Sequence, residues 1–267
     1  MLLQIKTPEE ITQMRHAGLL LWQAHQVAAK MITAGTLTRD IDRAVEETLV
    51  AGGGIPLFKG VPGKVPFPAA TCISLNEEVV HGIPSSRVLN EGDLVSLDIG
   101  VKLNGWCADA AVTYAVGEID EEKARLLRVT EECLARAIGA LRPGVRWSKI
   151  ALKLQKFAER EGFSVVEELV GHAIGREMWE PPQVPNFFTR QMPDFKLRTG
   201  LVLAIEPMIN LGRKEVVLRP DHWTIASRDG KPSAHFEHTV ALTEDGPVVL
   251  TCGPNGEGWG MGQSQNR

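Results

Sequence analysis

Two aspartates flank a strong hairpin signal in the first half of the chain. Asp98 and Asp109 lie on either side of Asn104-Gly105, a dipeptide typical of a two-residue β-turn. A turn at Asn104-Gly105 places Asp98 opposite Ala111, with Asp109 diagonally adjacent, whereas a turn at Leu103-Asn104 pairs the two aspartates directly. Both registers put the carboxylates on one face of the sheet, because a shift by two residues preserves the side-chain period. A three-residue loop would separate them.

The neighbours of these aspartates are mostly apolar. Asp98 lies in "VSLDIGV" and Asp109 in "CADAAVTY", and neither stretch resembles a solvated strand. Two buried negative charges repel each other and are costly unless a cation neutralises them. The pair therefore indicates a divalent metal site, and the alternative is two solvated aspartates on an exposed sheet face.

The second half of the chain adds a histidine and two glutamates. His172 lies between glycines in "VGHAIGREMWEPP", and glycines let the backbone bend and approach a site closely. We expect His172 to reach the site from a loop; the alternative is a histidine in an ordinary surface loop. Glu206 ends the apolar strand "LVLAIE", and Glu237 lies in "AHFEHTVAL", where neighbouring residues alternate as in a strand.

Four carboxylates and one imidazole suit hard or borderline divalent ions better than a cysteine-type zinc site. Manganese, iron, cobalt and zinc are the candidates. Paired ions of this kind lie about 3.5 to 4 Å apart and activate a bridging water as a nucleophile. Hydrolysis is therefore the leading reaction class.

Helices are expected on both sides of these strands. Thr7 has the character of an N-cap, with Pro8 at the first helical position and acids in the first turn. The expected helices run from Thr7 to about Thr33, from Thr38 through "RDIDRAVEETLVAGG", over "DEEKARLLRVTEECLARAIGAL" up to the stop "RPG", and over "WSKIALKLQKFAEREG".

The same plan occurs twice along the chain. Gly35 and Ile41 match Gly144 and Ile150 at an offset of 109 residues, and "GDLVSLD" matches "GLVLAIE" at an offset of 108. Two matches at nearly one offset predict an internal duplication. We expect two halves related by a pseudo-two-fold axis, over about 7–117 and 120–250, within a single domain over 1–252.

Composition excludes several other classes of protein. The chain has 267 residues and a formal net charge of -4, without a basic face for nucleic acid or an anionic membrane. Its four cysteines fall singly, so we expect reduced thiols in a cytoplasmic protein. The N-terminal residues do not resemble a signal peptide, and no apolar run approaches a membrane span. The glycine-rich segment 253–267 is expected to be a flexible tail.

The five candidate ligands and their flanks resemble a known family. Together with "CISLNEEVVHGIP", "VGHAIG", "AIEPMIN" and "HFEHTVALTEDG", they resemble the type I methionine aminopeptidases, from Ile5 to about Leu250. The resemblance implies the α+β pita-bread fold, in which two pseudo-two-fold related helix-helix-sheet halves surround a central curved antiparallel sheet. It also implies a monomeric, cytoplasmic enzyme that removes the initiator methionine from nascent chains, at the ribosome.

The resemblance also implies roles for individual residues. Two divalent metal ions would be bound by Asp98, Asp109, His172, Glu206 and Glu237. Glu206 would also handle protons, and His81 would contact the scissile region of the substrate. The residues that would line the methionine pocket are Phe67, Cys72, Met178 and Trp223, with Phe58 as a further candidate. Each of these pocket residues could instead belong to the ordinary core.

Trp179 departs from the family pattern. The family carries a second substrate-contacting histidine at this position, and an indole can donate one hydrogen bond but cannot accept one or carry a proton. We expect Trp179 at the substrate-facing wall of a slower enzyme. The alternatives are a pita-bread aminopeptidase or dipeptidase of different specificity, and a non-catalytic binding protein on the same fold.

Overall fold

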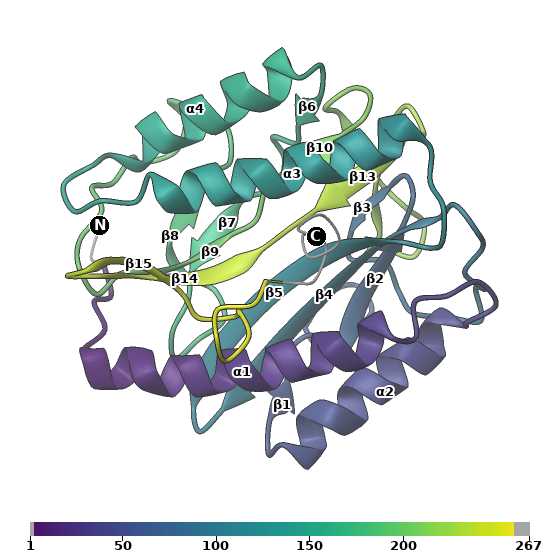
Figure 1. The fold of residues 1–267 in the computed structure, drawn as a ribbon, viewed down its shortest axis with the longest axis horizontal. Coiled ribbons are helices and arrows are strands. Elements are labelled where there is room, and N and C mark those ends of the chain that lie inside the picture. Colours follow the sequence, from purple (N-terminus) through teal and green to yellow (C-terminus); the bar gives the residue numbers. More distant parts are fainter. Residues whose placement is uncertain (1–2, 259–267) are drawn as a thin grey trace.

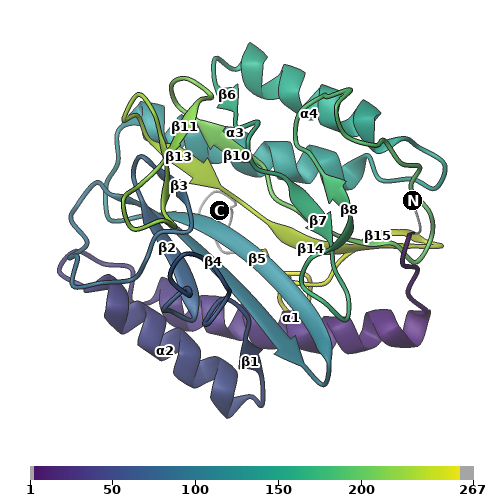
Figure 2. The same ribbon diagram turned by 180° about the vertical axis from the view of Figure 1, so that it is seen from behind.

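The strands of the molecule lie between two pairs of helices. The computed structural model describes residues 3–258. Helices α1 (Pro8–Ala29) and α2 (Thr38–Ala51) cover one side, and α3 (Glu121–Gly139) and α4 (Trp147–Arg160) cover the other (Figures 1 and 2). All strand pairs are antiparallel. The fold class is the expected α+β arrangement.

Helix α1 begins where its cap predicts. Thr7 and Glu10 form a capping box, in which each side chain accepts the backbone N–H of the other residue. Helix α1 ends at Ala29, short of the expected Thr33. The Met31 N–H donates to the Ala28 carbonyl at 2.8 Å in a tighter turn at this end. Gly35 follows with φ +92°, and its N–H donates to the Leu89 carbonyl at 2.8 Å.

The first half contains an uninterrupted hairpin. Strands β4 (Leu94–Leu103) and β5 (Trp106–Ala115) meet at the Asn104-Gly105 turn, where both residues have positive φ. Asp98 pairs with Ala111 and Gly100 with Asp109, which confirms the first of the two registers considered above. Strands β1 (Ile55–Pro56) and β2 (Thr71–Leu75) pair with β4 on its other edge.

The second half repeats this hairpin with interruptions. Strand β9 (Val202–Ile205) continues as β10 (Met208–Asn210) after a break at Glu206 and Pro207. Its partner is divided into β13 (Ser233–His235) and β14 (His238–Thr243) by a break at Phe236 and Glu237. The neighbouring strands are β6 (Ser164–Val165), β7 (Gly171–Ala173), β8 (Glu180–Val184) and β15 (Gly246–Val249).

Pairing registers repeat between the halves. Ile55 pairs with Lys102 in the first half as Ser164 pairs with Asn210 in the second. The isolated bridge Leu37–Val88 is matched by Arg146–Lys196. These pairs keep the offsets of 109 and 108 residues read from the sequence, so the repeat extends to strand register.

One connection differs strongly between the halves. Strands β4 and β5 are joined by two residues, whereas the equivalent β10 and β13 are joined by residues 211–232. This longer connection contains β11 (Val216–Leu218) and β12 (Ile225–Ser227), and β12 pairs with β3 (Glu78–Val80) of the first half. The connection therefore reaches across to the other half.

The C-terminal segment packs on α1. The Arg15 guanidinium donates to the carbonyls of Leu250, Cys252 and Gly253 at 2.6–2.7 Å. Residues 259–267 of the expected tail lie outside the described part of the chain. All four cysteines are free. Among the described residues, no helix is long and apolar enough to cross a membrane.

Candidate metal centre

Five candidate ligands come from both halves. Asp98 and Asp109 lie on β4 and β5, and Glu206 directly follows β9. Glu237 lies in the break between β13 and β14, so its strand is interrupted where the sequence alternation predicted continuity. Its backbone N–H donates instead to the Ala111 carbonyl of β5 at 2.8 Å, which joins the two hairpins.

The expectation that His172 reaches the site from a loop is wrong. His172 lies on β7, paired with Gln183 of β8 on one side and with Ala204 of β9 on the other. Its neighbour Gly171 serves close strand packing, because a Cβ there would lie 2.4 Å from the Ala204 carbonyl oxygen. The partner Ala204 is distant in sequence, and a strand of three residues leaves no local periodic signal.

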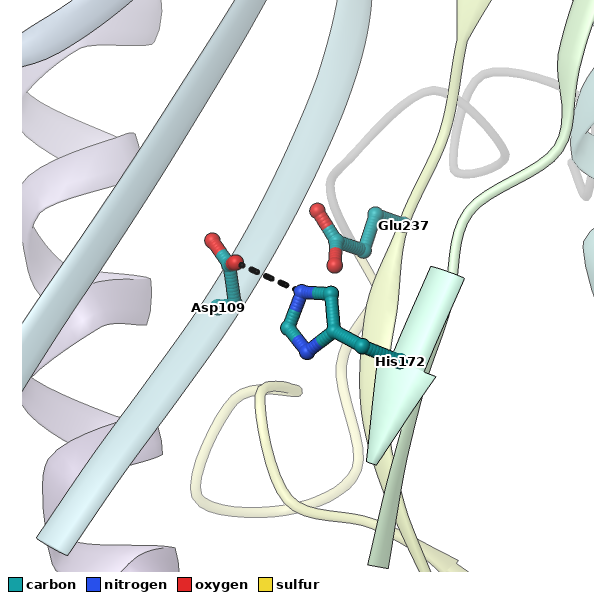
Figure 3. Close-up of side chains that lie close together, drawn as sticks. All are labelled: Asp109, His172 and Glu237. Atoms are coloured by element: carbon teal, nitrogen blue, oxygen red, sulfur yellow. Dashed lines mark ion pairs between the residues drawn. The ribbon is translucent and has the colours of Figure 1, made fainter. Parts of the chain in front are cut away.

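Three of the five side chains form a tight cluster. One ligand atom each from Asp109, His172 and Glu237 lies within 4.8 Å of the others (Figure 3). His172 Nε2 lies 3.6 Å from Asp109 Oδ2 and 3.8 Å from Glu206 Oε1. Asp98 is near enough to Asp109 and Glu206 for their charges to shift its pKa.

The cluster has the properties of a cation site. Among the described residues, Asp98 Oδ1, Asp109 Oδ1 and Glu237 Oε1 are buried without a hydrogen-bond partner. Burial and mutual repulsion raise the pKa values of Asp98 and Glu237 well above normal, and burial raises the pKa of Glu206 to about 8. A divalent cation would supply the missing partner for these oxygens, so the residues fit a metal.

His172 is oriented as a metal ligand would be. Its Nδ1 lies 3.0 Å from the Ala173 carbonyl oxygen, which can only accept, so Nδ1 carries a proton and Nε2 faces the carboxylates. Burial acts to lower the pKa of His172, but the interaction with the Asp109 carboxylate as acceptor and the charge of Glu206 raise it overall. The net rise in the pKa of this imidazole therefore comes from its acidic neighbours, which together outweigh burial.

An apolar pocket adjoins the cluster. Phe58, Phe67, Cys72 and Met178 are buried together, and Trp223 packs edge-on against Phe67 with ring centroids 5.2 Å apart. The Trp223 indole N–H donates to the Val65 carbonyl at 2.7 Å. One cavity of about 110 Å³ is lined by these five side chains and by all five candidate ligands. Cys72 pairs directly with Asp98 in the β2–β4 ladder, which places pocket and cluster side by side.

His81 and Trp179 line the opening of the site. Both border the small cavity and a neighbouring cavity of about 660 Å³. His81 has a φ of +59°, rare for a residue other than glycine, and burial lowers its pKa to about 4. The Trp179 side chain is 57% exposed. His81 is thus a neutral imidazole, and Trp179 forms an outer wall.

His235 is a site residue that the sequence analysis missed. Its Nε2 is buried without a hydrogen-bond partner in the described structure and lies 3.7 Å from Glu206 Oε2. Burial lowers the pKa of His235 to about 3, so this imidazole is neutral. Its position two residues before Glu237 was the available signal, because alternate residues of a strand share a face.

Comparison with known proteins agrees with this geometry. The chain is 46% identical over 246 residues to methionine aminopeptidase 1 of Bacillus subtilis (strain 168), covering 92% of this chain and 98% of that protein. It resembles the crystal structure of a methionine aminopeptidase from Thermotoga maritima with a TM-score of 0.89 and 43% identity, covering 94% of this chain and 99% of that one. A prolidase from Pyrococcus furiosus is more distant, with a TM-score of 0.75 and 25% identity, covering 92% of this chain and 65% of that one.

These matches confirm the resemblance to methionine aminopeptidases that the ligand motifs indicated. The model of metallopeptidase family M24 matches residues 12–244, which include all five candidate ligands. The chain therefore belongs to metallopeptidase family M24.

Proposed function

We propose that the protein is a methionine aminopeptidase, a metal-dependent hydrolase that releases the N-terminal methionine from peptide chains. The observation that carries this proposal is the shared cavity, in which the five candidate ligands face a pocket of aromatic, thiol and thioether side chains. An apolar, polarisable lining suits a methionine side chain. The pocket would bind the side chain of the first residue, and the cluster would lie beside the peptide bond that follows it.

Two divalent ions would be held by Asp98, Asp109, His172, Glu206 and Glu237, with cobalt, manganese, iron and zinc as the candidate metals. When bound, such ions polarise a carbonyl and lower the pKa of a coordinated water. Support comes from the three buried carboxylate oxygens that have no other partner in the described residues. Four carboxylates also supply enough negative charge for more than one divalent ion.

Protein side chains would position the substrate and transfer protons. Glu206, next to the cluster, would take a proton from the attacking water and pass it to the leaving amine. The neutral His81 at the cavity opening would hydrogen-bond the scissile peptide group. Trp179 would add apolar contact, and its indole N–H would replace part of the donor capacity of the family's second histidine.

The substrates would be the N-termini of newly made chains, met in the cytoplasm at the ribosome by a monomeric enzyme. The similarity to proteins named methionine aminopeptidase supports this proposal. Small second residues would be preferred.

Release of free methionine from Met-Ala-Ser by metal-reconstituted protein tests the function. We expect turnover with Mn²⁺ or Co²⁺ and none after chelation. Asp98→Asn should abolish turnover, whereas the matched Asp245→Asn at an exposed turn should not. Cleavage of an Xaa-Pro dipeptide in place of Met-Ala-Ser would indicate a prolidase, and metal binding without turnover on either substrate would indicate a binding protein.

A further inference from the structure

A buried ion pair lies behind the wall of the proposed methionine pocket. The Lys6 ammonium donates to the Glu180 carboxylate, and the two side chains are 4% and 2% exposed. In every other Lys or Arg ion pair among residues 3–258, the cation is at least 23% exposed. Because both charges are buried, loss of either partner would leave the other charge uncompensated and would destabilise the protein.

The same carboxylate closes a turn. Glu180 Oε1 accepts the backbone N–H of Arg176 at 2.9 Å and that of Glu177 at 3.4 Å. Gly175 begins the turn with no space for a side chain, since a Cβ there would lie 2.6 Å from Glu180 Oε1 and 2.7 Å from Lys6 Nζ. Residues 175–179 are thus wrapped around the ion pair.

This turn carries two of the residues that line the proposed substrate site. Met178 is buried in the apolar pocket, and Trp179 borders both cavities. A Cβ on Gly100 of β4 would lie 3.0 Å from Met178 Cε, so Met178 packs directly over the strand that carries Asp98. A shift of the turn would therefore move the pocket wall relative to the metal cluster.

Lys6 is itself held firmly. Its backbone N–H donates to the Gly200 carbonyl at 2.7 Å, and the capping box of α1 begins at the next residue, Thr7. The ammonium is thereby fixed to the body of the second half and to α1. It provides one fixed point for the turn. The turn also contacts the β4–β5 hairpin, because the Cys107 N–H donates to the Gly175 carbonyl at 2.8 Å and the Arg176 guanidinium lies 3.7 Å from the centroid of the Trp106 ring.

We propose that Lys6 and Glu180 are positioning residues for substrate selection. They hold the turn 175–179 so that Met178 and Trp179 close the pocket around the first side chain of the substrate. The inference rests on the proposed function for the identity of that side chain. The N-terminal segment, which contributes no metal ligand and no pocket residue, would thereby take part in specificity.

Two double variants distinguish the loss of the hydrogen bonds to the turn from the loss of the two charges alone. Lys6→Met with Glu180→Gln removes both charges but keeps an oxygen that can accept from Arg176 and Glu177. Lys6→Met with Glu180→Leu removes the charges and the acceptor. Lys214→Met with Glu167→Leu is the matched control, because it removes an exposed ion pair.

We expect the Gln double variant, which keeps the acceptor for the turn but loses the ammonium that fixes it, to lose about tenfold in kcat/KM for Met-Ala-Ser relative to wild type. The Leu double variant should lose about 10²-fold, since a displacement of about 1 Å in a positioning element has that effect. Its preference for Met-Ala-Ser over Leu-Ala-Ser should fall about tenfold. The affinity for Mn²⁺ alone, measured by titration calorimetry, should change by less than about threefold in both variants, and the control should match wild type.

Equal rates and equal preferences in the two double variants would overturn the proposal. So would a parallel loss of Mn²⁺ affinity and activity, because the pair would then support β7 and His172 rather than the turn. Amide hydrogen exchange on the wild-type protein tests the hydrogen bonds from the turn to Glu180 even if a variant does not fold. Arg176 and Glu177 should exchange slowly, and rates like those of exposed amides would reject the hold on the turn. If wild type releases no methionine, the proposed function fails, while the exchange result still tests the turn.

Discussion

The two halves share a plan but treat their central hairpin differently. In the first half, β4 and β5 run without interruption past both aspartates. In the second half, both equivalent strands are broken where Glu206 and Glu237 lie. The first half thus provides its aspartates from continuous strands, whereas the second half provides Glu206 and Glu237 from backbone that has left its own ladder.

Equivalent register positions have different chemistry. The pair Met208–His235 corresponds to Gly100–Asp109, so the uncharged His235 occupies the position of the ligand Asp109. Glu206 and Glu237, which face each other across the break, correspond to Asp98 and Ala111. A symmetric framework has therefore acquired an asymmetric set of donors, with Thr239 Oγ1 joining the halves by hydrogen bonds to the N–H and carbonyl of Asp109 at 2.9 and 2.8 Å.

Substitution at the Asp109 and His235 positions tests this asymmetry most strongly. Asp109→Ala should reduce turnover of Met-Ala-Ser by at least about 10³-fold, because metal activation contributes several kcal/mol. The protein should remain folded, since Thr239 binds the backbone of residue 109. His235→Gln should lose only about 10- to 100-fold, as expected for a residue that orients a ligand. Circular dichroism checks folding, and equal losses in the two variants would contradict the difference between the halves.

Substrate charge gives the next largest expected effect. The pocket combines Phe67 and Cys72 of the first half with Met178 and Trp223 of the second, and these four side chains offer no hydrogen-bonding carboxylate of their own to a cation. Met-Ala-Ser should exceed Lys-Ala-Ser by at least about 10²-fold in kcat/KM, because an unpaired charge is costly to bury. Comparable rates for the two peptides would show that the first side chain binds elsewhere.

Metal removal should make stability depend on pH. The folded pKa of Glu206, about 8, exceeds its unfolded value of 4.5, so the folded state binds this proton more tightly. The resulting stabilisation is complete below pH 4.5 and is lost as the pH rises through about 8. Between pH 6.5 and 8, the free energy of unfolding of metal-free protein should fall by about 1 kcal/mol per pH unit on average for this carboxyl, since the slope decreases as the pH approaches the folded pKa.

Asp98 and Glu237 have pKa shifts in the same direction and should add to this slope. Urea denaturation of chelated and metal-loaded protein measures it. The loaded protein should show a flatter profile, and a metal-free stability that rises over this pH range would contradict the burial of these carboxyls.

Trp179→His should give the smallest change. Restoring a second imidazole at the site should raise kcat by about tenfold, less than the 10²- to 10³-fold associated with a complete oxyanion donor, because the indole N–H already supplies part of it. Steady-state kinetics on Met-Ala-Ser gives kcat and KM separately. An unchanged or lower kcat would assign a positive role to the exposed indole.

Local sequence signals predicted the first half better than the second. The Asn104-Gly105 signal left two registers for Asp98 and Asp109, both with the carboxylates on one face, and the structure has the first of them. The N-cap signal at Thr7 located the start of α1. His172 was misplaced because its strand is only three residues long and depends on partners distant in sequence. Lys6 and Glu180 could not be paired from the sequence, since 174 residues separate them and neither lies in a periodic pattern.

The connection over residues 211–232 has an evolutionary consequence. It joins β10 to β13 where the first half needs only two residues, and it brings Trp223 over the pocket while β12 pairs with β3. Its residues take no part in the β10–β13 and β9–β14 pairings that bring Glu206 and Glu237 together. Catalysis and substrate preference could thus diverge separately, and grafting of this segment between relatives offers a route to new selectivity on an unchanged catalytic framework.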